Sequence, residues 1–380
     1  MTTDRIPFNR PYGVGTELGY VAQAHGNRHL SGDGAFTRDC HRWLEDQTGT
    51  AKALLTHSCT TALEMAALLL DLSPGDEIIM PSFTFVSTAN AFAMRGAIPV
   101  FVDIRGDTLN LDETLIEAAI TPRTRAIVPV HYAGVSCEME QILEIARHFN
   151  LAVIEDAAQG LMARYKGRPL GAIGALGSLS FHETKNIQSG EGGALLVNNP
   201  TMIARAEILR EKGTDRTRFF RGEVDKYTWQ DIGSSSLPSE ITAAFLWAQL
   251  EAAERITAER LALWRRYHEL LAPLEKRGLL RRPIIPAGCD HNGHIYYVLL
   301  ASTVNRQPVL DRLKVDGIGA VFHYVPLHSS PAGKRLGRSN GNLRRTTSLS
   351  QQLVRLPMWI GLGEVQQQMV VDRLAAALQK

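Results

Sequence analysis

The hydrophobic pattern of the chain alternates between continuous apolar runs and helical stripes. Residues 97–104, 125–132 and 151–156 form continuous apolar runs, which are typical of strands buried on both faces of a sheet. Residues 60–71 are apolar almost all round and residues 137–149 carry apolar side chains at helical spacing, so both segments are predicted to be helices. Strands that alternate with helices in this way predict an α/β fold with a mostly parallel sheet between helices.

The pattern changes near residue 240. Residues 239–278 form one long stretch with helical character, and mixed strand-like and helix-like segments follow it, among them 294–301 and 308–317. A chain of 380 residues is long for a single hydrophobic core. We therefore predict a large domain over residues 1–250 and a smaller C-terminal α+β domain over residues 251–380.

The composition of the chain indicates its cellular compartment and excludes some classes of partner. The formal net charge is +2, so no strong field favours nucleic acid or a membrane surface. The four cysteines are widely spaced without a CxxC pair, which indicates neither a zinc site nor a disulfide framework. The N-terminal residues lack the apolar core of a signal peptide, and the apolar run at 62–70 is too short to span a bilayer. We expect a cytoplasmic protein that holds no metal and binds neither nucleic acid nor a membrane.

Three short motifs suggest other chemistries. "GVGTELG" at 13–19 resembles a dinucleotide-binding fingerprint, but it follows no strand and has an extra residue before its last glycine. "HETKN" at 182–186 begins like a zinc-protease motif but lacks the second histidine. "HNGH" at 291–294 and the pair His323 and His328 suggest a metal, although histidines that hydrogen-bond near a strand end explain them better.

A single lysine, Lys185, occupies an unusual position. It lies in a polar bend between two strand-like runs, 178–181 and 194–197, and small and hydrogen-bonding residues surround it. A structural lysine normally points outward into water. Partial burial would lower the pKa of this amine and make the free base available as a nucleophile and proton carrier.

Two other segments supply groups that complement an amine. Asp156 ends a buried strand, where a carboxylate needs a cation such as a pyridinium nitrogen; a surface aspartate that caps the next turn is the alternative. Thr60 and Thr61 stand at the start of a predicted helix, where amides and hydroxyls form an anion site. An ordinary threonine cap explains these two residues at least as well when they are taken alone.

An aromatic residue completes the set. Phe85 follows a strand end, where its ring can cover a planar cofactor, although a core aromatic is the simpler explanation of this residue alone. Pyridoxal 5′-phosphate (PLP) needs a lysine amine, a carboxylate for its ring nitrogen, a phosphate cradle and a cover for its ring. The combination of Lys185, Asp156 and Phe85 with the two threonines therefore predicts a PLP site.

The chain resembles the DegT/StrS-type sugar aminotransferases. The matching motifs run in order from about residue 5 to 330 and are TALEMA, GDEIIMPSFTFVSTANAFAMRGAIPVFVDI, TPRTRAIVPVHYAG, VIEDAAQG, KGRPLG, SFHETKN and GEGGALLVNN. The resemblance implies the fold-type-I architecture of PLP aminotransferases. It also implies a homodimer whose active sites lie at the subunit interface.

The resemblance further implies roles for individual residues. Lys185 would form the Schiff base with PLP, and Asp156 would pair with the ring nitrogen. Gln159 would lie near the hydroxyl or ring of the cofactor, and Phe85 would stack on the ring. The residues implied at the phosphate are Thr60, Thr61 and Ser180.

Two features separate this chain from the general family. Many relatives carry a GYNYRM segment whose asparagine reaches the phosphate in the neighbouring subunit, whereas residues 233–238 here are GSSSLP and place Ser235 at that position. Residues 210–235 and 322–333 resemble the dTDP-4-amino-4,6-dideoxygalactose transaminases of enterobacterial common antigen and related polysaccharide pathways.

The predicted reaction moves an amino group from L-glutamate to carbon 4 of dTDP-4-keto-6-deoxyglucose. His323 is a candidate for substrate contact, and the candidates for the pyrophosphate are Arg216, Arg218 and Arg221, although solvated surface arginines explain these three at least as well. A transaminase for another nucleotide-linked keto-sugar and a non-catalytic PLP-binding regulatory protein are the alternatives. Lys185 argues against a dehydratase of the same fold, which would carry histidine at that position.

Overall fold

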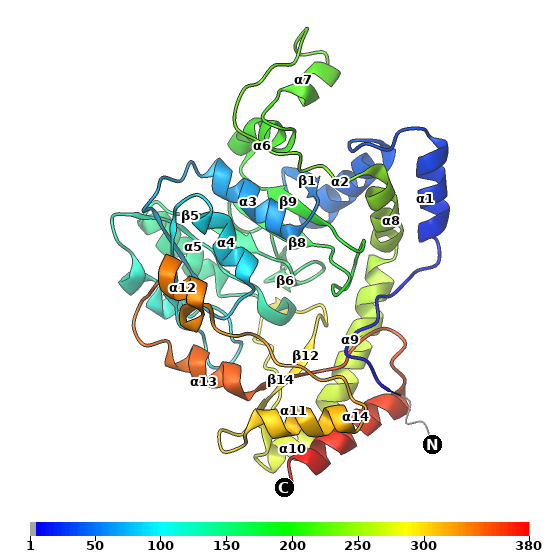
Figure 1. Cartoon of the computed structure of the whole chain (residues 1–380), viewed down its shortest axis with the longest axis vertical. Helices are drawn as coiled ribbons and strands as arrows, with labels where there is room; N and C mark the ends of the chain where they lie inside the picture. The colour runs from blue at the N-terminus through cyan, green and yellow to red at the C-terminus, as the bar shows by residue number, and fades with distance from the viewer. Residues whose placement is uncertain (1–4, 380) are drawn as a thin grey trace.

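The computed structural model describes residues 5–379, and its centre is an eight-stranded sheet in the order β1-β9-β8-β5-β4-β2-β3-β13 (Figure 1). Its strands are β1 (Lys52–Thr56), β2 (Glu77–Pro81), β3 (Ile98–Val102), β4 (Thr124–Ile127), β5 (Ala152–Asp156), β8 (Leu176–Ser180), β9 (Gly193–Val197) and β13 (Arg338–Ser339). All neighbouring pairs from β8 to β13 are parallel, and β9 runs antiparallel to both β1 and β8. The sheet is therefore mostly parallel, as the apolar runs predict.

Helices cover both faces of this sheet because successive strand residues point to opposite sides. Ile79 and Val153 belong to one hydrophobic cluster, whereas Ile78 and Ile154 belong to another. The helices of this part are α1 (Glu17–Gly26), α2 (Ala35–Thr48), α3 (Cys59–Leu69), α4 (Val86–Ala93), α5 (Met139–His148), α6 (Ile203–Arg210) and α8 (Glu240–Glu251). Residues of α2, α5 and α8 join the first cluster, and residues of α3, α4 and α6 join the second.

The C-terminal part builds a second, smaller sheet in the order β10-β12-β14, which is antiparallel. Its elements are β10 (Leu280–Arg281), β12 (Tyr296–Leu300), β14 (Leu353–Leu356), α9 (Ala253–Leu270), α10 (Ala272–Lys276), α11 (Arg306–Val315) and α14 (Glu364–Ala377). A separate hydrophobic cluster joins this sheet to its helices. β13, although late in the chain, pairs with β3 of the large sheet. The domain division at residue 250 stays a prediction.

Shorter elements complete the described chain. They are the three-stranded sheet of β6 (Arg164–Tyr165), β7 (Arg168–Pro169) and β11 (Cys289–Asp290), the helices α7 (Arg216–Phe220), α12 (Pro331–Leu336) and α13 (Arg344–Gln352), and the 3-10 turns Glu113–Leu115, Glu117–Ala119, Tyr132–Gly134, Pro200–Met202 and Leu327–Ser329. The segment around α7 projects from the body of the molecule (Figure 1). No helix in residues 5–379 has the length and apolarity needed to cross a membrane.

The prediction of one long helix over 239–278 is wrong. The structure divides this stretch into α8, α9 and α10, and Ala252, between α8 and α9, has φ −98° and ψ 7°. α8 packs on α1 and α2 beside the large sheet, whereas α9 packs on α14. Because α8 and α9 pack against different hydrophobic cores, the backbone turns between them, although neither Gly nor Pro marks the break.

Candidate active site

The loop between β8 and β9 holds Lys185 inward. Backbone hydrogen bonds extend the β8–β9 hairpin into this loop, from Phe181 N to Gly192 O and from Ser189 N to Phe181 O, both 2.8 Å. The Lys185 amide donates to His182 O, also at 2.8 Å, which closes a turn at the lysine. The lysine is half-buried and lines a cavity of about 420 Å³.

The surroundings of Lys185 favour its neutral amine. Burial lowers the pKa of the Lys185 amine, and the nearby Arg355 guanidinium lowers this pKa further, while the Asp156 carboxylate acts in the opposite direction. A lowered pKa increases the fraction of free base at neutral pH. The amine can therefore act both as a nucleophile and as a carrier of protons.

Asp156 ends β5 and lines the same cavity. Its carboxylate accepts hydrogen bonds from Thr88 Oγ1 at 2.7 Å and from the Ala158 amide at 3.1 Å. Across residues 5–379, no lysine, arginine or histidine lies within ion-pair distance of this buried carboxylate. A buried carboxylate that is hydrogen-bonded but has no cationic partner suits a protonated ring nitrogen.

The start of α3 supplies an anion site on the cavity wall. Ser58 caps the helix by accepting from the Thr61 amide at 3.1 Å, and Thr60 Oγ1 lies 2.7 Å from Ser87 Oγ. The Cys59 and Thr60 amides begin the helix, where no intrahelical acceptor exists for them. β9 approaches this helix start so closely that a Cβ on Gly193 would lie 2.3 Å from the Cys59 amide nitrogen. These features form a cradle that fits a phosphate.

The predicted phosphate residues fall into two groups. Thr60 and Ser180 line the cavity of Lys185. The Thr61 hydroxyl instead lies 3.1 Å from Ser58 Oγ within the helix cap, and Thr61 is not among the lining residues. The structure thus brings two of the three hydroxyls to the cavity and leaves the third in the cap.

The predicted ring contacts also lie at this cavity. Phe85 caps α4 at the cavity rim and is 58% exposed, so its ring can cover a planar group from the solvent side. Gln159 is buried, and its Oε1 accepts from the Ala133 amide at 2.7 Å. Its Nε2 donates to the Tyr324 hydroxyl at 3.1 Å, which fixes the amide plane of Gln159 against the cavity wall.

Residues from the C-terminal part also line this cavity, and most of them were not predicted from the sequence. His323 was predicted and does line the cavity; its ring lies 3.1 Å from the Tyr132 hydroxyl. His294, Tyr324 and Arg355 join it there without having been predicted. Arg355 could have been noticed in the sequence because it is a charged residue inside the otherwise apolar strand β14.

Ser235 lies in a second cavity, of about 700 Å³, away from Lys185. Arg216 and Arg221 line this second cavity, and Arg218 does not. Each of the three arginines pairs with a carboxylate of the same chain: Arg216 with Glu211 at 3.2 Å, Arg218 with Glu223 at 3.2 Å, and Arg221 with Glu207 at 3.0 Å. Contacts of Ser235 or these arginines with a cofactor or nucleotide, bound in a neighbouring subunit, stay predictions.

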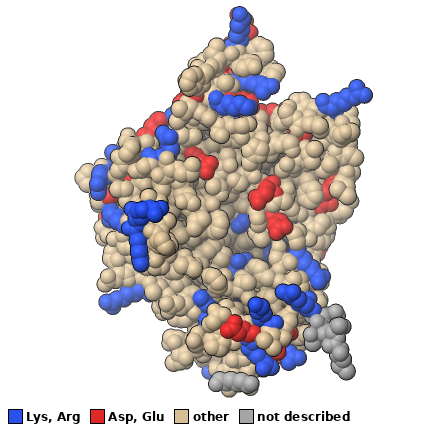
Figure 2. Space-filling view, in the orientation of Figure 1, with Lys and Arg blue, Asp and Glu red and all other residues tan. Residues whose placement is uncertain are grey.

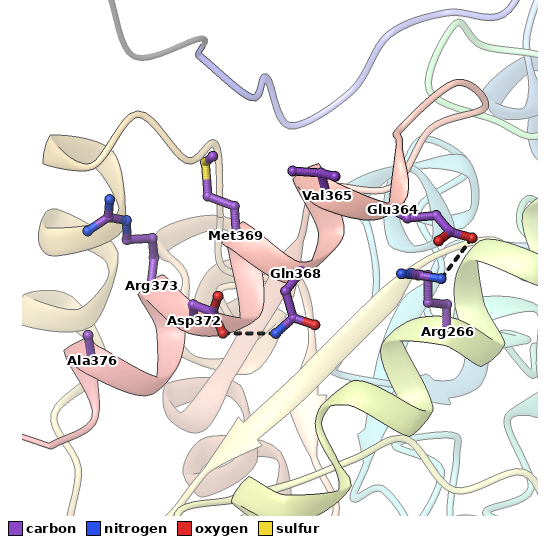
Figure 3. A pocket seen from close by; sticks show the side chains of 8 residues that line it. All are labelled: Arg266, Glu364, Val365, Gln368, Met369, Asp372, Arg373 and Ala376. Carbon is purple, nitrogen blue, oxygen red and sulfur yellow. Dashed lines mark hydrogen bonds and ion pairs between the residues drawn. The ribbon is translucent and has the colours of Figure 1, made fainter. Parts of the chain in front are cut away.

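The other surface features do not combine a buried lysine, a carboxylate and an anion site as the Lys185 cavity does. A groove of about 610 Å³ on α9 and α14, with an Arg266–Glu364 ion pair of 2.9 Å at one end, shares no lining residue with the Lys185 cavity (Figure 3). Figure 2 shows lysine and arginine interspersed with aspartate and glutamate over one face of the molecule. Residues 5–379 contain no group of three or more His, Cys, Asp or Glu side chains placed to hold a metal ion.

Comparison with known proteins identifies the family. The model of the DegT/DnrJ/EryC1/StrS aminotransferase family matches residues 12–375. The chain belongs to this family. It is an aminotransferase, its fold is that of the fold-type-I PLP aminotransferases, and PLP is its cofactor, as the sequence predicts.

Individual relatives agree with this assignment. GDP-perosamine synthase of Caulobacter vibrioides is 35% identical over 380 residues, covering 98% of this chain and 97% of that protein. The dTDP-3-amino-3,4,6-trideoxy-alpha-D-glucose transaminase of Streptomyces venezuelae is 35% identical over 325 residues, covering 85% and 82%. The structure of Spr1654 from Streptococcus pneumoniae in its PLP form is 25% identical, with a TM-score of 0.90 over 99% of each chain.

Proposed function

We propose that this aminotransferase moves the amino group of L-glutamate to carbon 4 of a nucleotide-linked 4-keto-6-deoxyhexose. The observation that carries the proposal is that one cavity holds both Lys185 and Asp156, whose carboxylate has no ion-pair partner in residues 5–379. The anion site at the start of α3 lines the same cavity. When bound there, PLP supplies an electron sink that lets an amino group pass between a donor and a ketone. Asp156 would hold the proton on the ring nitrogen of PLP. Lys185 would take the proton from the donor α-carbon and later give a proton to carbon 4 of the sugar.

We propose dTDP-4-keto-6-deoxyglucose as the acceptor and dTDP-4-amino-4,6-dideoxygalactose as the product. The support is the resemblance of residues 210–235 and 322–333 to the transaminases that make this sugar. Both named relatives carry a nucleotide-linked amino sugar in their names, which supports a nucleotide sugar in general. The product would enter polysaccharide biosynthesis, with enterobacterial common antigen as the expected example.

A GDP-linked 4-keto-6-deoxyhexose is the second candidate acceptor. The observation that favours it is the 35% identity to GDP-perosamine synthase over nearly the whole chain. The two candidates differ in the nucleotide base but share the ketone that must stand over the cofactor. Lys185 and Asp156 would play the same roles with either acceptor.

The test is amination of a panel of dTDP- and GDP-linked keto-sugars with glutamate and PLP, followed by NMR of the product. We expect turnover with the dTDP-4-keto sugar and a single product of galacto configuration, because Lys185 would deliver its proton from one fixed face. A gluco product, or amination at carbon 3, would contradict the substrate assignment. Turnover with the GDP-linked sugar alone would establish the second candidate in its place.

We also propose a homodimer in which each subunit completes the active site of the other. The support is a group of exposed large side chains on the projecting segment around α7 (Figure 1), which include Phe220 at 70% and Trp229 at 81% exposure. Exposed apolar groups of this size mark interaction surfaces. Light scattering should give twice the chain mass, and the double substitution Phe220→Ser and Trp229→Ser should shift the mass toward that of one chain. A monomeric wild-type protein that aminates sugar would refute the shared site.

The proposed compartment is the cytoplasm. Cys40, Cys59, Cys137 and Cys289 are all buried free thiols. Free thiols persist in a reducing compartment.

A further inference from the structure

Two threonines, Thr84 and Thr88, connect the carboxylate of Asp156 to the start of α4, which is drawn in cyan in Figure 1. Thr88 Oγ1 donates to Asp156 Oδ2 at 2.7 Å, and Thr84 Oγ1 lies 2.8 Å from Thr88 Oγ1. Both threonines are buried. The other carboxylate oxygen, Asp156 Oδ1, accepts from the Ala158 amide at 3.1 Å. Each oxygen of the carboxylate therefore has one donor that the protein supplies.

The hydrogen bonds among these side chains run in one direction. An ionised carboxylate only accepts hydrogen bonds, and a threonine hydroxyl has one proton to donate. Thr88 therefore donates its proton to Asp156 and accepts the proton of Thr84. Because Thr84 occupies the acceptor side of the Thr88 hydroxyl, the rotation of this hydroxyl is fixed toward Asp156. Hydrogen bonds arranged in such a chain polarise and strengthen one another.

Thr88 differs from other threonines in the helices of this chain. The hydroxyls of Thr48, Thr257 and Thr347 each donate to the carbonyl oxygen four residues earlier, at 2.6, 2.8 and 3.0 Å. This local bond is a common choice for a threonine within a helix. The Thr88 hydroxyl instead donates to a carboxylate 68 residues away in the sequence. Its placement therefore serves Asp156 rather than helix α4.

We propose that Thr88 is a positioning residue that holds the Asp156 carboxylate in the orientation that PLP requires. The proposal rests on the proposed role of Asp156, which is to hold the proton on the ring nitrogen of PLP. A hydrogen bond between a ring nitrogen and a carboxylate depends on direction as well as distance. The Asp156 side chain can rotate about two bonds, and donors on both of its oxygens remove this freedom.

Thr88 can influence the reaction only through Asp156. Asp156 and Thr84 line the Lys185 cavity, whereas Thr88 is not among the lining residues. The Thr88 hydroxyl therefore cannot contact a cofactor or substrate in this cavity. Removing the hydroxyl should weaken the reaction when Asp156 is present and matter much less when the carboxylate is gone.

The test is a double-mutant cycle on PLP-loaded protein. It combines Thr88→Val, which removes the hydroxyl at similar volume, with Asp156→Asn, singly and together. Thr88→Ser keeps the hydroxyl, and Thr257→Val is the matched control, because it removes the hydroxyl of a buried helical threonine outside the cavity. The first readout is the rate of the cofactor absorbance change with glutamate, with and without deuterium at the α-carbon. The second is the cofactor absorbance spectrum without glutamate, which requires no turnover.

We expect Thr88→Val to slow proton removal from glutamate about 10- to 100-fold, the range for losing a hydrogen bond to a charged group. Its spectrum without glutamate should shift toward that of Asp156→Asn. In the Asp156→Asn background the same substitution should cost at least about 5-fold less, because groups in contact are not additive. Thr88→Ser should recover most of the wild-type rate, and Thr257→Val should match the wild type.

Rate losses that add fully in the double variant would overturn the proposal, because Thr88 would then act independently of Asp156. An unchanged rate and spectrum in folded Thr88→Val would also overturn it, as would a Thr88→Ser variant as slow as Thr88→Val. Thr88→Ala takes the place of Thr88→Val in the cycle if the latter does not fold. Failure of the proposed role of Asp156 has a different signature, because Asp156→Asn itself would then leave the rate and the spectrum unchanged.

Discussion

Replacing Lys185 with alanine is expected to reduce amino transfer by at least about 10²- to 10⁴-fold, the usual contribution of a positioned acid–base group. The variant also loses the amine that bonds the cofactor, so the total loss should exceed this range. Lys185 lies in a turn whose backbone hydrogen bonds do not involve its side chain, so the fold should persist. Amination rate and intact mass after borohydride reduction are the measurements, and we expect the wild type to retain the cofactor mass and Lys185→Ala to lose it.

Lys166→Ala is the matched control for this substitution. Lys166 is an exposed lysine whose ammonium pairs with Glu140 at the surface. This variant should aminate at the wild-type rate and retain the reduced cofactor. Near-normal amination by folded Lys185→Ala would show that another group carries the reaction.

Asp156→Asn is expected to slow proton removal from the donor by orders of magnitude while leaving cofactor binding through the phosphate in place. An opposite charge nearby typically shifts a pKa by about 1–3 units, which corresponds to about 1.4–4 kcal/mol of preference for the protonated ring nitrogen. The neutral amide removes this preference. Stopped-flow absorbance with glutamate, with and without deuterium at the α-carbon, measures the step directly.

The control for Asp156→Asn is Asp46→Asn, which changes an exposed carboxylate on α2. That variant should react like the wild type. If Asp156→Asn kept the wild-type rate and isotope effect, the carboxylate that holds the ring proton would have to lie elsewhere.

The large sheet was predictable because its strands carry a local signal. The apolar runs at 97–104 and 151–156 became β3 and β5, buried on both faces as their continuous apolar pattern requires. Strand direction has no such signal, so the antiparallel setting of β9 did not follow from its sequence. The end of α8 at Ala252 was not predictable from the sequence either, because it results from the packing of α8 and α9 on two separate cores.

The residues of the candidate active site also fall into those that the sequence predicted and those that it did not. Asp156 was predicted because it ends a recognisable strand, where ligands of such sheets bind, and Lys185 was predicted because it lies in a polar bend between two strand-like runs. Arg355 and His294 reach the cavity through the pairing and placement of the small sheet, which joins segments far apart in the sequence. Thr61 was predicted to contact the phosphate but lies in the helix cap instead. A threonine at the start of a helix can take either role.

This chain is expected to take an amino group from glutamate through PLP held beside Lys185. The most direct measurement adds glutamate alone to PLP-loaded protein and follows cofactor absorbance together with the 2-oxoglutarate released. We expect the wild type to lose the PLP absorbance and to form one 2-oxoglutarate per active site, and we expect neither change in Lys185→Ala. Unchanged absorbance and no 2-oxoglutarate in the wild type would contradict it.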